Sequence, residues 1–225
     1  MVMVKICGIR SEEDIAAAEG ADALGFIVST PGSPRNLEPA RARALIQNAP
    51  PALLKVVVTT CEELDQLLAL GEDLAPDALQ VHSALSVQKF TQLRALTQLR
   101  LYGLLPIVGP VQEIIARGRA LAQVGLDGVI LDTVVGHRVG GTGRTHDWTV
   151  SRAVRDALHP MTVIIAGGLT PQNVQRALAQ VRPAGVDVAS GVEEADGRKS
   201  RAKIRAFIHQ VRSYENSSAT QNQAH

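Results

Sequence analysis

Short apolar runs alternate along the chain with longer stretches of helical periodicity. The runs are rich in Val, Ile and Leu and lie near residues 2–6, 23–28, 53–59, 78–81, 99–105, 128–131, 161–166 and 185–188. Between them, apolar residues return every three or four positions, as in 39–47 and 111–122, which is typical of amphipathic helices. The pattern predicts eight strands separated by helices. Ser11 to Asp14 has the form of a capping box, and Pro171 is expected to open another helix.

Strands that read as continuous apolar runs are expected to be parallel and covered on both faces, because parallel neighbours need a crossover helix. Eight such units in roughly 250 residues or fewer fit a single α/β domain, a (β/α)8 TIM barrel with eight parallel strands over residues 1–215. An open doubly wound sheet is the alternative, but "KICGIR" after the first run is not its G-x-G-x-x-G fingerprint. Residues 216–225 are polar without an apolar face, and we expect a disordered tail there.

Composition narrows the choice of partners. The 225 residues are 45% hydrophobic, enough for a substantial core, and 23 basic against 22 acidic residues give a net charge of +1. Without a basic block, and with 3% aromatic residues, the chain is not expected to bind nucleic acid, so a small molecule is the expected partner. No apolar run approaches the roughly 20 residues needed to cross a bilayer, and the start lacks a secretory leader. We therefore expect a cytoplasmic protein with no membrane partner.

The two cysteines have neither metal-ligand nor disulfide spacing, so each thiol is considered separately. Catalytic groups of such barrels project from the carboxyl ends of the strands. Cys7 ends the first strand and Asp132 the sixth, on the same rim. A thiol near a helix N-terminus can have its pKa drawn below about 8.5, and Gly8 beside it would let a substrate approach closely.

A carboxyl group in a pocket that excludes water can have its pKa raised and serve as an acid. Cys7 and Asp132 are therefore suited to taking a proton from carbon while protonating an oxygen. Taken alone, each residue also has a structural interpretation. Cys7 would be a small buried apolar side chain, and Asp132 would cap a helix or a turn.

Glycines end the last two strands and lead into helix starts. Gly167 and Gly168 follow the seventh strand, and Ser190 and Gly191 follow the eighth. Backbone N–H groups beside helix N-termini bind phosphate, and barrels commonly place that site after strands seven and eight. The alternative is that these glycines only form tight turns.

Three further features lie on the same rim. Gly141 and Gly143 belong to the longest loop, where either a lid or plain flexibility would require glycine. Arg35, after the second strand, could clamp a carboxylate or lie solvated on the surface. His82 ends the fourth strand and is either catalytic or packed at the rim.

Six motifs, in order over residues 2–212, resemble the phosphoribosylanthranilate isomerase family: "VKICGIR", "GADALGFIV", "SPR", "LDT" followed by "GGTGRTHDW", "IIAGGLTPQNV" and "GVDVASGVE". The resemblance implies a TIM barrel that needs no cofactor or metal and acts in tryptophan biosynthesis. The implied reaction is the Amadori rearrangement of N-(5-phosphoribosyl)anthranilate to 1-(2-carboxyphenylamino)-1-deoxyribulose 5-phosphate. The chain would act as a monomer or a homodimer.

By position in these motifs, Asp132 resembles the family's general acid and Cys7 its general base, while Arg35 would face the anthranilate carboxylate. The implied substrate-binding set is Arg35, His82, Gly141, Gly143, Gly167, Gly168, Asp187, Ser190 and Gly191. The chain departs from the family pattern at Thr59, Ser83 and Ala189, none of which is the proposed acid or base.

Two alternatives remain. The first is a different barrel that acts on a phosphosugar. A histidine-pathway isomerase would have a two-aspartate site, and indole-glycerol-phosphate synthase would use a lysine and glutamates. Cys7 argues against both. A barrel that only binds a phosphorylated ligand would not need Cys7 and Asp132 together.

Overall fold

Eight parallel strands close into a barrel in the computed structural model, which describes residues 1–135, 138–139 and 147–223. The strands are β1 (Met3–Cys7), β2 (Ala23–Ile27), β3 (Leu54–Thr59), β4 (Ala78–Val81), β5 (Arg100–Pro106), β6 (Gly128–Asp132), β9 (Thr162–Ile165) and β10 (Gly185–Val188). Around the barrel they run β1-β10-β9-β6-β5-β4-β3-β2. The predicted TIM barrel and its eight strands are confirmed, because both faces of every strand are buried and each therefore reads as an apolar run.

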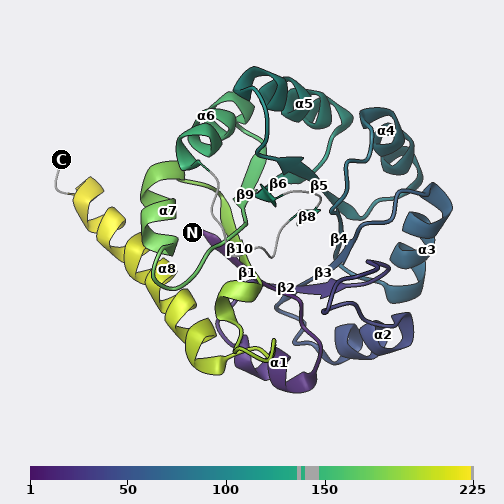
Figure 1. Ribbon diagram of the computed structural model, residues 1–225, viewed down its shortest axis with the longest axis horizontal. Coiled ribbons are helices and arrows are strands. Elements are labelled where there is room, and N and C mark those ends of the chain that lie inside the picture. The colour runs from purple at the N-terminus through teal and green to yellow at the C-terminus, as the bar shows by residue number, and fades with distance from the viewer. Residues whose placement is uncertain (136–137, 140–146, 224–225) are drawn as a thin grey trace.

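Helices surround the strands as an outer ring (Figure 1). They are α1 (Glu12–Ala17), α2 (Pro39–Asn48), α3 (Leu64–Leu74), α4 (Val87–Leu96), α5 (Val111–Val124), α6 (Trp148–Leu158), α7 (Val174–Val181) and α8 (Arg201–Gln223), with a 3-10 helix, η1 (Ser190–Val192). The Ser11 hydroxyl accepts the Asp14 N–H at the start of α1, as the capping pattern predicts. Within the described residues, no helix combines the length and apolar character that crossing a bilayer requires.

The structure departs from the sequence expectations in three places. Helix α7 begins at Val174 rather than Pro171, because the Asn173 side chain accepts from the Thr170 N–H and donates to the Gly168 carbonyl, which holds a turn ahead of the helix. A short hairpin, β7 (Val134–Val135) and β8 (Arg138–Val139), follows β6. Helix α8 continues to Gln223 where a disordered tail was expected from residue 216, since extending an existing helix costs far less than starting one.

Two apolar clusters divide the core. The larger lies between strands and helices and includes Phe26, Phe90 and Phe207. The smaller consists of alternate strand residues such as Val56, Tyr102 and Ile130, which point into the barrel. Because the inner cluster fills the barrel, polar side chains that share its inward direction gather at the carboxyl rim.

Candidate active site

A cavity of about 580 Å³ opens at the carboxyl ends of the strands. This is a size typical of small-molecule sites. Its lining includes the described candidates from the sequence: Cys7, Arg35, His82, Asp132, Gly167, Gly168, Asp187, Ser190 and Gly191. Gly141 and Gly143 lie outside the described residues. The barrel therefore brings together, in one cavity, residues that are as much as 184 positions apart in the sequence.

The Cys7 thiol lies inside the barrel wall and is 6% exposed. Burial raises the pKa of Cys7 above its ordinary value; Lys5 and Lys199 oppose this shift, and Asp187 adds to it. The expectation that a helix N-terminus lowers this pKa is therefore wrong. Helix α1 begins only at Glu12, and the resting group is a thiol.

Lys5 lies beside this thiol, one inward position earlier on β1. It is 1% exposed, and its Nζ is 3.0 Å from Asp187 Oδ2. Burial lowers the pKa of Lys5, but attraction to Asp187 and Cys7 outweighs it, so the pKa lies above its ordinary value. Asp187 Oδ1 is buried without a hydrogen-bond partner among the described residues. A buried ion pair with one spare acceptor therefore lies at the cavity, whose lining includes Asp187.

Asp132, three strands away from Cys7 around the rim, is 4% exposed, is hydrogen-bonded to the backbone and lies beside His82. Its Oδ1 accepts the Thr133 N–H at 2.6 Å, and its Oδ2 is 3.3 Å from His82 Nε2. Gln80 Nε2 lies 3.2 Å from His82 Nδ1. With Gln80 donating to Nδ1, a neutral His82 carries its proton on Nε2 and presents it to Asp132. His82 therefore orients the carboxyl group that sequence analysis selected as the acid.

The glycines after β9 and β10 bring backbone and side chains unusually close. A Cβ on Gly167 would lie 2.3 Å from Thr133 Oγ1 and 2.6 Å from Asp132 Oδ1. A Cβ on Gly191 would lie 1.8 Å from the Leu169 carbonyl oxygen. Gly167 thus makes room for the carboxyl group of Asp132, and Gly191 lets the loops after β9 and β10 touch.

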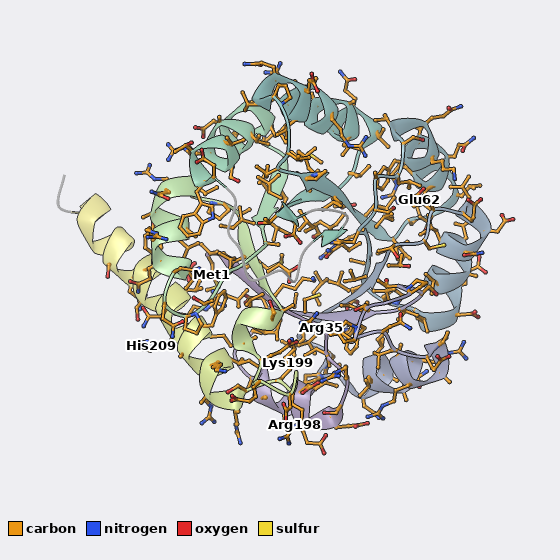
Figure 2. The ribbon with its side chains drawn as sticks, viewed as in Figure 1. Met1, Arg35, Glu62, Arg198, Lys199 and His209 are labelled. Atoms are coloured by element: carbon orange, nitrogen blue, oxygen red, sulfur yellow. The ribbon has the colours of Figure 1, made fainter. Side chains whose placement is uncertain are left out.

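Arg35 is held by an acidic partner that sequence analysis did not select. Its Nε and Nη2 donate to the two carboxylate oxygens of Glu193 at 2.7 and 2.6 Å. Lys199 donates to Glu193 at 2.8 Å and to the Ala189 carbonyl at 3.1 Å. Figure 2 shows Arg35 and Lys199 close together, from the loops after β2 and before α8.

Burial raises the pKa of Glu193, but its bonds to Arg35 and Lys199 outweigh this effect and hold the pKa below its ordinary range. Arg35 also explains Gly8. A Cβ at position 8, where φ is +81°, would lie 2.5 Å from Arg35 Cδ. Gly8 therefore accommodates the arginine stem, and this replaces the expected approach of substrate over that residue.

Among the described residues, no three His, Cys, Asp or Glu side chains converge to hold a metal ion. The family model for N-(5'-phosphoribosyl)anthranilate (PRA) isomerase matches residues 4–210, almost the whole barrel. The chain belongs to this isomerase family. It is 42% identical over 211 residues to the N-(5'-phosphoribosyl)anthranilate isomerase of Haloferax volcanii, covering 92% of each chain.

Solved structures of the isomerase family agree with this assignment. The Thermotoga maritima phosphoribosyl anthranilate isomerase has a TM-score of 0.81 and 31% identity, covering 95% of this chain and 100% of that one. A phosphoribosyl anthranilate isomerase in complex with reduced 1-(o-carboxyphenylamino)-1-deoxyribulose 5-phosphate has a TM-score of 0.78 and 30% identity, with the same coverage. The resemblance of the six motifs to this family is thereby confirmed.

Proposed function

We propose that this chain catalyses the isomerisation of N-(5-phosphoribosyl)anthranilate in tryptophan biosynthesis by an Amadori rearrangement, with Asp132 as general acid and Cys7 as general base. The observation that carries the proposal is the shared cavity. A buried thiol and a buried carboxyl group line it from β1 and β6, and the glycine loops of β10 and β9 lie between them. A sugar phosphate anchored on those loops would have the base on one side and the acid on the other.

In this reaction, the Asp132 carboxyl group gives its proton to the furanose ring oxygen, and the ring C–O bond opens to a Schiff base. The Cys7 thiolate then takes the C2 proton, and the electron pair forms the enolamine double bond. The enolamine becomes the ketone by gaining a proton at C1 and losing one from the C2 hydroxyl. Each turnover leaves one proton on Cys7 and removes one from Asp132, so both groups re-equilibrate with solvent before the next.

The remaining residues supply binding. The loops at Gly168 and Gly191 offer backbone N–H groups for the phosphate, together with the Ser190 hydroxyl. Two buried acceptors in the cavity, Asp187 Oδ1 and Gln80 Oε1, have no partner among the described residues and are available to ribosyl hydroxyls. Arg35 would share its guanidinium between Glu193 and the anthranilate carboxylate.

The test is the loss of the substrate's anthranilate-type fluorescence on addition of the protein. Cys7→Ser and Asp132→Asn should each lower kcat by about 10²–10⁴-fold, because each removes one proton-transfer group. Cys61→Ser and Asp156→Asn are matched controls, since both residues lie outside the cavity. Unchanged fluorescence with fresh substrate would leave a barrel that only binds a phosphorylated ligand. Near-normal turnover in either active-site variant would remove that residue from the mechanism.

A further inference from the structure

A buried lysine accompanies the proposed base and has no part in the mechanism above. Lys5 and Cys7 are two positions apart on β1, so both side chains point into the barrel. A Cβ placed on the neighbouring Gly25 would lie 2.8 Å from Cys7 Sγ and 3.1 Å from Lys5 Nζ. The two groups therefore converge on one glycine, and no side chain on β2 at that position separates them.

Asp187 fixes the position of the ammonium group. Residues 5 and 187 are register partners on the adjacent strands β1 and β10, and their side chains pair at 3.0 Å. At 1% exposure a lysine without an acidic partner would be strongly disfavoured as a cation. The pair thus keeps a positive charge beside the thiol, at a site where bulk water cannot stabilise a thiolate.

We propose that Lys5 is a positioning residue for Cys7: its ammonium group, anchored by Asp187, stabilises the thiolate that the carbon-acid step requires. The inference deepens the proposed function, since a thiol that stays protonated cannot take the C2 proton. The thiol proton leaves to solvent through the open cavity, and the thiolate regains a proton from C2 during turnover.

The charges around the thiol support this assignment. Cys7 is faced by Lys5 on its own strand, Asp187 on β10, Lys199 before α8 and Arg35 after β2. Arg35 and Lys199 are both held by Glu193. With Glu193 included, this group carries one excess positive charge while Cys7 is a thiol. Ionisation of Cys7 balances that charge, and among these cations Lys5 favours the thiolate most strongly.

The experiment measures the ionisation of Cys7 without substrate. In a Cys61→Ser background, Cys7 is the only thiol of the chain, and its alkylation rate by uncharged iodoacetamide is followed against pH. Lys5→Met keeps the length of the side chain but removes its charge, and it should move the midpoint upward by about one pH unit or more. Ile6→Ala empties a fully buried site on the same strand without changing any charge, and it should leave the midpoint in place.

This control distinguishes an electrostatic role from a structural one, because a loosened barrel would shift the midpoint in both variants. If Lys5→Met fails to fold, Lys5→Met/Asp187→Asn removes both charges. It should still raise the midpoint, since Lys5 acts on the thiol more strongly than Asp187 does. An unchanged midpoint in a folded variant that lacks Lys5 would overturn the inference. The result is independent of turnover, so it stands or fails separately from the proposed reaction.

The pH dependence of catalysis gives the second readout. The rising limb of kcat/KM against pH should move upward in Lys5→Met by the same amount as the alkylation midpoint. A variant that lowered kcat at every pH without moving this limb would show that Lys5 only supports the structure.

Discussion

At the scale of single residues, the position of the proposed acid depends on the absence of a side chain at position 167. Gly167 has φ +79° and faces Asp132 and Thr133 so closely that a methyl group cannot fit beside them. The carboxyl group of Asp132 therefore occupies the space that any other residue at position 167 would fill. This gives Gly167 a role in orienting the acid, in addition to shaping the loop after β9.

Gly167→Ala should accordingly lower kcat by about 10²-fold, because the Asp132 carboxyl group must move away from its hydrogen bond with the Thr133 N–H. The control is Gly109→Ala. Gly109 has φ +84°, but a Cβ there would meet no atom of the described residues within 4 Å. Both variants carry a similar backbone cost of about 1–2 kcal/mol. Gly167→Ala also displaces Asp132 and Thr133, so it should be the less stable of the two, and turnover per folded molecule should fall only in that variant. Equal kcat in the two variants would contradict the contact argument.

Sequence predicted the rim residues well and their partners poorly. Cys7, Asp132 and His82 stand at the ends of apolar runs, and the barrel topology alone places such positions around one cavity. Glu193 could not be predicted, because its bond to Arg35 joins residues 158 positions apart, which no local pattern encodes. Lys5 left a detectable signal, since a lysine inside an apolar strand two positions before a candidate base indicates a buried partner.

At the scale of elements, the segment of residues 193–200, between η1 and α8, forms an ion pair with the loop after β2. It contributes Glu193 and Lys199, and the Glu193 side chain is 7% exposed where it meets Arg35. Removing one member of a buried charge cluster leaves the others uncompensated, at a cost of roughly 3–5 kcal/mol. The segment therefore matters for stability as well as for presenting Arg35.

Glu193→Gln should lower the free energy of unfolding at neutral pH by roughly that amount. The pKa of Glu193 is held below its ordinary range in the fold, so its contribution is present above the unfolded-state pKa of about 4.3. That contribution is lost as pH falls through the folded-state pKa. Urea unfolding at several pH values should show wild type and variant converging in acid.

Glu194→Gln is the matched control for this prediction, because Glu194 is the next residue and pairs with Lys203 in a largely exposed position. Its effect should be much smaller at every pH, because solvent screens an exposed pair. A constant difference between wild type and Glu193→Gln across the pH range would show that Glu193 is not the titrating group.

The two ends of helix α8 differ in how much they contact the barrel. Its first half buries Ile204, Phe207 and Val211, and Arg212 pairs with Asp22 while Glu215 contacts the start of the chain. Farther along, the Ser217 hydroxyl donates within the helix, to the Ser213 carbonyl. Figure 1 shows this end of the helix projecting past the barrel.

Ending the chain after Asn216 should therefore change the free energy of unfolding by less than about 0.5 kcal/mol. Phe207→Ala, in the packed half of α8, should cost about 3–5 kcal/mol because it empties a fully buried site. Chemical denaturation of both variants compares them directly. A large loss on truncation would mean that the projecting turns contribute contacts to the barrel.

The elements themselves were predictable where apolar pattern decides them. All eight strands fall within a residue or two of the predicted runs. Strands buried on both faces consist of continuous Val- and Ile-rich segments, which are visible in the sequence. The boundaries that failed were set by side chains instead. Asn173 delays α7, and the polar end of α8 continues as helix because the packed half has already started it.

At the scale of the whole molecule, the order of the strands determines where the proposed base, acid and phosphate loops lie around the cavity. The strands β10 and β9 separate β1 from β6 around the barrel, so the proposed phosphate loops stand between the proposed base and acid. Contact between these two loops depends on Gly191 lying against the Leu169 carbonyl. An anion bound there would bridge consecutive βα units and should stabilise the folded chain as a whole.

Inorganic phosphate should consequently raise Tm. At ten times its Kd, the gain is about 1.4 kcal/mol, which corresponds to roughly 3–6 °C for a chain of this size. Gly191→Ala should abolish the increase, because its Cβ would push the two loops apart. Gly125→Ala, at the C-cap of α5 and away from the cavity, should lower Tm through backbone strain yet keep the phosphate response. Thermal unfolding with and without phosphate measures all three proteins, and an undiminished response in Gly191→Ala would place the anion somewhere other than these loops.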